Sequence, residues 1–413
     1  MTVIEQSYSS RIVTLRLGIL AAGLFVVGTN AFVIAGLLGR IADGLHTTEA
    51  RVGYSITLYS LIVAVASPIV SIVFASMDRT RLMAGGLAVI AIGTAITAIA
   101  PSLAVFELGR VLAAFGGAAL VPAATAAAPT LLPPDQRGRA LAIAALGFTL
   151  ATALGSPVGT ALAAGGDWRL PLGALAVLGA VVAVVLAVVV RGVPVGPVIG
   201  VRERLGALRG RAIVLTLVAV LVLTTAFNVV YIFSAPVTAK ATAGSSGLLA
   251  ILLLLYGVGG IIGTNLSGRL TDRLGSRTVV AIGLSGEAVV LAILPLVEGS
   301  YATLAVGFVL WGVLAFGVVV PVQHRLVGIE PKVAGIALSW YSTAMYVGIA
   351  LAPILGAAVL GGFGSLPGAS AVPLVGAALA VIALALFLLG FVRSRQVTAG
   401  EKRKPSHDLH TEV

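Results

Sequence analysis

The chain contains twelve long runs of apolar residues, and this feature limits its possible folds more than any other. A helix needs about 20 apolar residues to cross the hydrocarbon core of a bilayer. Because lipid offers no hydrogen bonds to the backbone, apolar runs of this length predict membrane-spanning helices. The runs lie near residues 17–39, 53–76, 82–100, 104–128, 138–163, 168–190, 212–236, 247–267, 278–297, 302–322, 334–360 and 370–392.

Composition supports a membrane protein, since 59% of the 413 residues are hydrophobic and 10% are charged. The net charge of +11 raises the question of a nucleic-acid partner. If the N-terminus is cytoplasmic, 21 of the 26 Lys and Arg residues fall on the cytoplasmic side, as the positive-inside rule requires. We therefore expect both termini in the cytoplasm of a multi-pass inner (plasma) membrane protein, and no nucleic-acid partner.

Cysteine is absent, which excludes disulfides and thiolate metal sites. The first 16 residues lead into a full-length span without a cleavage pattern, so we expect the first helix to remain in the membrane. The glycine-rich stretch 257–263 follows no strand, and no Walker lysine motif is present. We expect no cofactor and no metal.

The longest polar connection, residues 191–211, divides the chain into two sets of six spans. Asn30 and Asn228, Asp78 and Asp272, and Pro157 and Pro353 recur at offsets of 194 to 198 residues, as in transporters built from internal repeats. We predict a bundle over 1–190, a cytoplasmic loop over 191–211, a bundle over 212–393 and a disordered tail over 394–413. The basic cluster at 401–404 in this tail can contact anionic lipid.

The polar stretch "SGRLTDRLGSRT", residues 267–278, contains Gly268, Asp272, Arg273, Gly275 and Arg277. These residues match the G-x-x-x-D-R-x-G-x-R loop between the second and third helices of each half in the major facilitator superfamily. With twelve spans and a basic central loop, the chain resembles that superfamily over nearly its whole length. The resemblance implies an all-α membrane fold of twelve helices in two pseudo-symmetric six-helix bundles.

The first half carries a reduced copy of this loop, "FASMDRTRLM", which keeps Asp78 and Arg79. A helix N-terminus attracts a carboxylate, so Asp78 and Asp272 can dock against the start of a helix from the other half. Contacts of this kind would form in one transport state and break in the other. We predict a conformational latch made of Asp78, Arg79, Asp272, Arg273 and Arg277. The alternative is that the arginines only enforce topology.

Further stretches resemble the drug:proton antiporter group, in its sugar-efflux and chloramphenicol-efflux branch. They are "ELGRVLAAFGGAALVPA", which begins at Glu107, "PPDQRGRALA", "GFTLATALGSPVGTALAAGGDWR" and "GTNAFVIAGLLGRIADGL". The branch usually has Glu where this chain has Asn30. Gly155, Pro157 and Gly159 predict a bent, closely packed interface on the fifth span, although ordinary small-residue packing explains them equally well.

Charged residues inside a membrane are costly and usually functional. Glu107 and Arg110 lie three residues apart, so they share a helix face and can pair. In the resembling group this arginine is tied to proton transfer. Glu287 is a lone carboxylate in the middle of the ninth span, where we expect the protonated form. We predict proton coupling by Arg110, Glu107 and Glu287; a structural Glu107–Arg110 pair is the alternative.

Polar and aromatic residues at mid-depth are candidates for a substrate cavity, and each has packing between helices as its alternative explanation. Amides and rings with hardly any fixed charge suit a neutral or weakly cationic amphipathic molecule. The candidates are Asn30, Tyr59, Asn228, Tyr231, Tyr256, Asn265, Trp311, Trp340, Tyr341 and Tyr346.

The sequence thus predicts a monomeric secondary transporter that exports a drug, sugar or related metabolite by alternating access, in exchange for protons. An importer or an uncoupled facilitator remains open, because Asn30 replaces the usual Glu. A membrane enzyme or sensor is the remote alternative: the sequence shows neither a catalytic cluster nor an appended signalling domain.

Overall fold

The computed structural model describes residues 3–74, 76–133, 137–165, 167–193, 201–330, 334–362 and 368–401, and their regular structure is helical throughout. The α-helices are α1 (Val3–Phe32), α2 (Leu38–Gly44), α3 (Glu49–Val73), α4 (Arg79–Ala98), α5 (Leu103–Ala127), α6 (Arg137–Leu150), α7 (Ser156–Leu162), α8 (Arg169–Val189), α9 (Val201–Ala207), α10 (Arg211–Ile232), α11 (Ser234–Thr242), α12 (Ser246–Ile293), α13 (Tyr301–Gly317), α14 (Val319–Ile329), α15 (Ala334–Leu360) and α16 (Gly368–Glu401). Short 3₁₀ and π segments are η1 (Val33–Leu37), η2 (Ala128–Thr130), η4 (Ala151–Gly155), η5 (Ala163–Gly165) and η6 (Leu294–Leu296).

Ten helical segments in the described part of the chain are long and apolar enough to cross a membrane. The sequence predicts twelve spans, two more than these ten segments, and both of the missing spans can be located. One segment, Ser246–Leu296, covers two predicted runs, 247–267 and 278–297. The kink at Gly275, where φ is 77°, lies between them. The run 138–163 is interrupted by the π segment η4 and contributes the shorter apolar helix Leu146–Leu162. The twelve-helix all-α fold predicted from the sequence is confirmed.

Polar residues set where several helices begin. The side chains of Thr48, Asp78, Ser102, Ser245 and Ser300 each accept a hydrogen bond from a backbone N–H in the first turn of α3, α4, α5, α12 and α13. A polar N-cap satisfies donors that have no partner within the helix. These residues therefore separate apolar runs that follow one another closely in the sequence.

Two polar segments contain more helix than the sequence suggested. The connection 191–211 contains α9, with residues 194–200 outside the described part. The tail predicted to be disordered begins as helix, since α16 continues from the last span to Glu401; residues 402–413 lie outside the described part. Residues 393–399 hold neither Gly nor Pro, so nothing in that stretch breaks a helix already formed.

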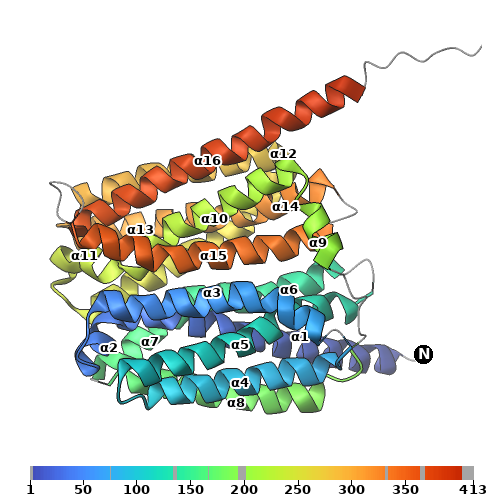
Figure 1. The fold of residues 1–413 in the computed structure, drawn as a ribbon, viewed down its shortest axis with the longest axis horizontal. Helices are drawn as coiled ribbons and strands as arrows, with labels where there is room; N and C mark the ends of the chain where they lie inside the picture. The colour runs from blue at the N-terminus through green and yellow to red at the C-terminus, as the bar shows by residue number, and fades with distance from the viewer. Residues whose placement is uncertain are drawn as a thin grey trace, which may run out of the picture.

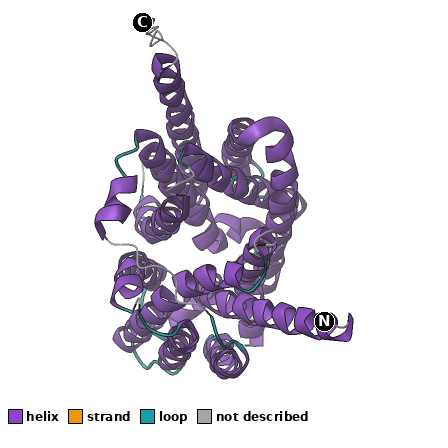
Figure 2. Ribbon diagram, turned by 90° about the vertical axis from the view of Figure 1, so that its right-hand side faces the viewer, coloured by secondary structure: helices purple, strands orange, loops and turns teal. Residues whose placement is uncertain are grey.

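The helices form two layers, α1 to α8 and α10 to α16 (Figure 1). The N-terminus and the C-terminal part of α16 lie at one end, which we term the terminal end; α2 and α11 lie at the opposite, distal end (Figure 1). Figure 2 views the helices from the terminal end. Across the layers, α15 packs against α3, and α12 packs against α7 and η4.

The contacts that join the layers lie toward the distal end. Arg40 Nη2 donates to Ser246 Oγ at 3.0 Å, and Thr57 Oγ1 donates to the carbonyl of Ala350 at 2.7 Å. Gly53, four residues into α3, faces Pro353 so closely that a β-carbon at Gly53 would lie 3.7 Å from Pro353 Cβ. The distal parts of α3, α12 and α15 therefore hold the two layers together.

Candidate functional site

Arg110 on α5 lies in the interior of the first layer, with 1% of its surface exposed. Its Nη1 donates to both the backbone carbonyl and the side-chain Oδ1 of Asn30 on α1, at 2.5 Å each. The guanidinium carbon lies 4.3 Å from the ring centroid of Tyr59 on α3, within cation–π range. Three helices thus hold one buried cation with an amide and an aromatic face.

The predicted Glu107–Arg110 pair is wrong. No ion pair joins them within the described residues: Glu107 is half-buried, whereas Arg110 extends inward to Asn30 and Tyr59. The amide of Asn30 also donates to Thr94 Oγ1 on α4, which donates to the carbonyl of Ile90 at 2.7 Å. Residues three apart share a face, but the side chain of Arg110 is long enough to reach other helices.

Glu287 on α12 is a buried charged residue in the second layer. Its side chain is fully buried, and among the described residues it and Arg110 are the only buried charged side chains. Trp311 Nε1 on α13 donates to Glu287 Oε1 at 3.4 Å, while Oε2 has no hydrogen-bond partner there. A buried carboxylate without a cation is costly in its ionised form, so this environment favours the neutral acid.

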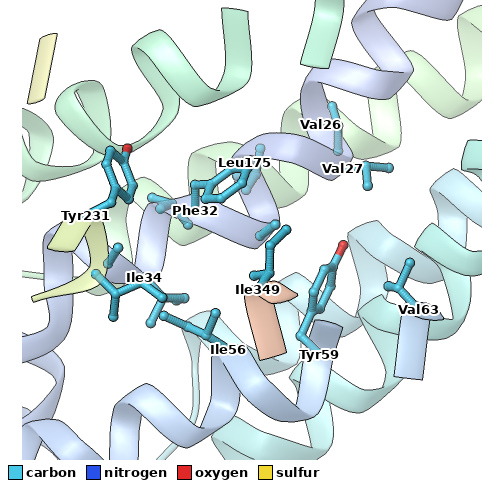
Figure 3. Packing of buried hydrophobic residues seen from close by; sticks show 14 of the residues in the cluster. Val26, Val27, Phe32, Ile34, Ile56, Tyr59, Val63, Leu175, Tyr231 and Ile349 are labelled. Carbon is cyan, nitrogen blue, oxygen red and sulfur yellow. The ribbon is translucent and has the colours of Figure 1, made fainter. Parts of the chain in front are cut away.

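A series of aromatic rings leads from Glu287 to the first layer. Trp311 stacks on Tyr256 with centroids 4.3 Å apart, Tyr256 lies 5.3 Å from Tyr231 on α10, and Tyr231 meets Phe32 at 6.0 Å. Figure 3 shows Tyr231 beside Phe32 and Ile34, and Ile349 of α15 close to Tyr59. The series crosses from the second layer to the last residue of α1.

Tyr231 contacts the first layer a second time. Its hydroxyl donates to the carbonyl of Thr152, in the π segment η4, at 3.4 Å. At the next residue of η4, a β-carbon on Gly257 would lie 2.3 Å from Ala153 Cα, so α12 and η4 meet backbone to backbone. A π segment leaves irregular backbone geometry and is frequent at functional sites.

The two buried charges lie beside tyrosines that are related by the internal repeat, although the charges themselves are on helices that the repeat does not relate. Tyr59 and Tyr256 are 197 residues apart, within the offsets of the internal repeat, and they lie on α3 and α12. Tyr59 carries Arg110 on its ring, and Tyr256 carries Trp311, the donor to Glu287. The first layer thus places a cation, and the second a carboxylic acid, next to equivalent tyrosines.

The remaining cavity candidates are dispersed. Tyr346 is 2% exposed and its hydroxyl has no partner in the described part, and Asn228 binds the Thr224 carbonyl of its own helix at 2.8 Å. Trp340 and Tyr341 are half-buried near the apolar cluster that contains Ile213 and Leu326. Asn265 is exposed and donates to Ile261 of its own helix.

The fifth-span residues pack against the first helix of the same layer. A β-carbon on Gly155 would lie 3.1 Å from Thr29, and one on Gly159 would lie 2.4 Å from Val33 Cγ2. Pro157 lies in the first turn of α7, directly after the π segment. The close approach therefore falls where α1 changes into the 3₁₀ segment η1.

The loop aspartates differ in their surroundings. Asp78 Oδ1 accepts the Arg81 backbone N–H at 2.9 Å, so it caps its own helix α4 rather than a helix of the other half. Asp272 is exposed, and neither a hydrogen bond nor an ion pair joins it to a described residue. The other latch candidates bind little: Arg79 is half-buried, Arg273 is exposed, and Arg277 lies 5.9 Å from the ring of Phe391.

Sequence reasoning missed three contributors to this region, namely Phe32, Thr94 and Thr152. Thr94 and Thr152 are polar residues within apolar runs, which is a usable signal, while Phe32 carries none because its neighbours are also apolar. Among the described residues, no group of three or more His, Asp or Glu side chains gathers where a metal could bind.

Comparison with known proteins agrees with this architecture. The profile of the Major Facilitator Superfamily matches residues 20–353 and 245–411. An uncharacterized MFS-type transporter, YbcL of Bacillus subtilis (strain 168), is 29% identical over 378 residues, covering 92% of this chain and 96% of that protein. The inner membrane transport protein YdhP of Escherichia coli (strain K12) is 29% identical and covers 91% and 95%.

Solved structures share the fold. A bacterial homologue of the human lysosomal transporter Spinster, in an inward-facing conformation, superposes with a TM-score of 0.71 at 18% identity, covering 93% of this chain and 97% of that one. A variant of the nucleoside transporter NupG gives 0.70 at 14% identity, covering 92% and 100%. The chain belongs to the Major Facilitator Superfamily, and it is a multi-pass membrane protein that acts as a secondary transporter of small molecules rather than as an enzyme.

Proposed function

We propose that this transporter exports a small amphipathic molecule, neutral or weakly cationic, in exchange for protons, as in the drug:proton antiporter group. The observation that carries the proposal is the buried Arg110, which Asn30 and Tyr59 hold and which no carboxylate of the described residues pairs with. A fixed positive charge at this depth serves function by default. The rings of Tyr59, Tyr231, Tyr256 and Trp311 supply apolar contact area for such a substrate.

The distribution of contacts between the layers supports alternating access. Arg40–Ser246 and Thr57–Ala350 join the layers toward the distal end. The positive-inside rule places that end outside, with both termini in the cytoplasm. We therefore interpret this conformation as closed to the outside. We further propose that the transporter lies in the inner (plasma) membrane of the cell and acts as a monomer.

One observation favours an uncoupled facilitator as the second candidate. The residue that accepts hydrogen bonds from Arg110 is an amide, and an amide carries no titratable proton. If no other group replaces the missing carboxylate, substrate moves down its own gradient in either direction.

Purified protein in proteoliposomes tests the proposal. A thermal-shift screen with chloramphenicol, ethidium, arabinose and uridine first identifies a binder, because a ligand of the folded state raises its melting temperature. Flux of that binder is then measured with and without an imposed pH gradient, with an internal pH dye reporting proton movement. We expect the gradient to accelerate flux and Arg110→Ala to abolish the acceleration.

Arg169→Ala is the matched control, since Arg169 lies at the distal end over Trp168 with 38% of its side chain exposed. This control should keep the response to the gradient. Equal flux with and without the gradient in the unmodified protein would establish the facilitator instead.

A further inference from the structure

We propose that Glu287 is a proton-binding site whose protonation closes the distal interface between the layers, acting through Trp311, Tyr256 and Tyr231. The inference rests on the proposed alternating-access function but not on the direction of transport or the identity of the substrate. The resembling branch usually carries an acid where this chain has Asn30, which left open where a proton could bind. The proposal places the exchangeable proton on a different helix, α12.

The first step is that no cation among the described residues balances the charge of Glu287. Beside Glu287, α13 contributes Trp311, α10 contributes Ala226 and α16 contributes Ala380. The α13 segment and residues 212–232 of α10 contain no charged side chain, and neither do residues 368–391 of α16. His324 and Arg325 of α14 lie toward the terminal end, and His324 is exposed.

The second step is that the titratable groups facing Glu287 are phenols. Tyr256 interacts electrostatically with Glu287 and with Tyr231, and the apolar Val318, between α13 and α14, lies near Gly283. Neither phenol supplies a positive charge. In the present conformation Glu287 is therefore neutral, with Oε1 accepting from Trp311 and Oε2 unpaired among the described residues.

The third step is the consequence of losing that proton. A carboxylate in this site needs hydrogen-bond donors, and the Tyr256 hydroxyl is a buried donor without a partner in the described part of the chain. Drawing Tyr256 toward Glu287 shifts the ring away from Tyr231 and moves Gly257 relative to Ala153. Gly257 contacts η4 directly, and Tyr231, against which Tyr256 packs, contacts both Phe32 and η4. Ionisation of Glu287 therefore loosens the distal interface.

The chain lacks cysteine, which allows a direct assay of this interface without any substrate. The pair Gly53→Cys and Pro353→Cys places two thiols across α3 and α15, where the β-carbon separation of 3.7 Å suits a disulfide. Oxidation rates are measured in nanodiscs at about pH 5.5 and about pH 9.5, values that bracket the range open to a buried carboxyl. The same pair carrying Glu287→Gln serves as reference, since it retains the pH dependence of the thiols alone.

We expect the two rates to agree at the acidic pH, and the rate with Glu287 to fall at least about threefold below the Gln reference at the alkaline pH, as a population shift requires. Glu287→Asp should keep the dependence on pH. The intrinsic fluorescence of Trp311, obtained as the difference from Trp311→Phe, should titrate with Glu287 and remain constant in Glu287→Gln.

A rate ratio that does not change with pH, or a Trp311 signal that titrates in Glu287→Gln, overturns the proposal. Gel filtration of each variant shows that it is folded before it is compared. A transporter that ignores an imposed pH gradient but shows this ratio would refute proton-driven export and leave the Glu287 site intact, so the two failures are distinguishable.

Discussion

Arg110 donates through one guanidinium nitrogen to both the main-chain carbonyl and the side-chain oxygen of Asn30, at 2.5 Å each. This double contact fixes the buried cation to the point where α1 ends and η1 begins. Arg110 Nε and Nη2 have no hydrogen-bond partner in the described residues. Asn30 is therefore the main hydrogen-bond partner of the guanidinium there.

Asn30→Ala should lower the melting temperature more than substitution of an exposed amide. Removing the side-chain acceptor leaves the buried cation with only the main-chain carbonyl of residue 30 as a hydrogen-bond partner among the described residues, and losing a hydrogen bond to a charged group costs about 1.5–3 kcal/mol. Asn265→Ala is the control, because that amide is exposed and bonds within its own helix. Thermal unfolding in detergent measures both; equal melting temperatures would show that Asn30 does not stabilise Arg110.

The engineered pair Gly53→Cys and Pro353→Cys should form a disulfide and stop transport until a reductant is added. The bond would hold α3 against α15, and rocking of the two layers requires these helices to separate. Each single substitution is the control, since it cannot form the intramolecular bond. Transport that continues unchanged after complete oxidation would contradict a mechanism in which the layers part at this end.

Gly257→Ala should weaken distal closure, because the added β-carbon would lie 2.3 Å from Ala153 Cα and 2.6 Å from its carbonyl oxygen. The backbones must move apart to admit it, which lowers the disulfide rate of the Gly53→Cys and Pro353→Cys pair. Gly173→Ala on α8 is the matched change, since nothing lies within 4 Å of its β-carbon position. It should leave the rate unaltered and stabilise the helix by about 1 kcal/mol.

Asp272→Asn should impair transport more than Asp78→Asn at equal expression. Asp78 caps α4 through the Arg81 N–H, and Asn caps a helix about as well as Asp. Asp272 is exposed in this conformation, so its negative charge is available to dock a helix end in another transport state. Equal transport rates for the two variants would argue against a latch that depends on the second-half loop.

The helices themselves could be predicted from the sequence because the bilayer imposes a simple rule on the chain. Apolar runs of about 20 residues must become helices when no other hydrogen-bond partner is available, and residues such as Thr48, Asp78 and Ser300 begin helices by capping them. The interruption of the run 138–163 by a π segment was not predicted, since its residues are as apolar as those of an unbroken helix.

The sequence by itself determined the spans, the internal repeat and the presence of two membrane charges, Arg110 and Glu287, because these depend on local composition and spacing. Only the tertiary structure decided the partners of those charges. Arg110 binds Asn30, 80 residues away, instead of Glu107, and Glu287 faces Trp311 and the rings that lead to Phe32. A long side chain in a bundle selects among all helices that surround it, and that choice depends on packing between segments distant in sequence.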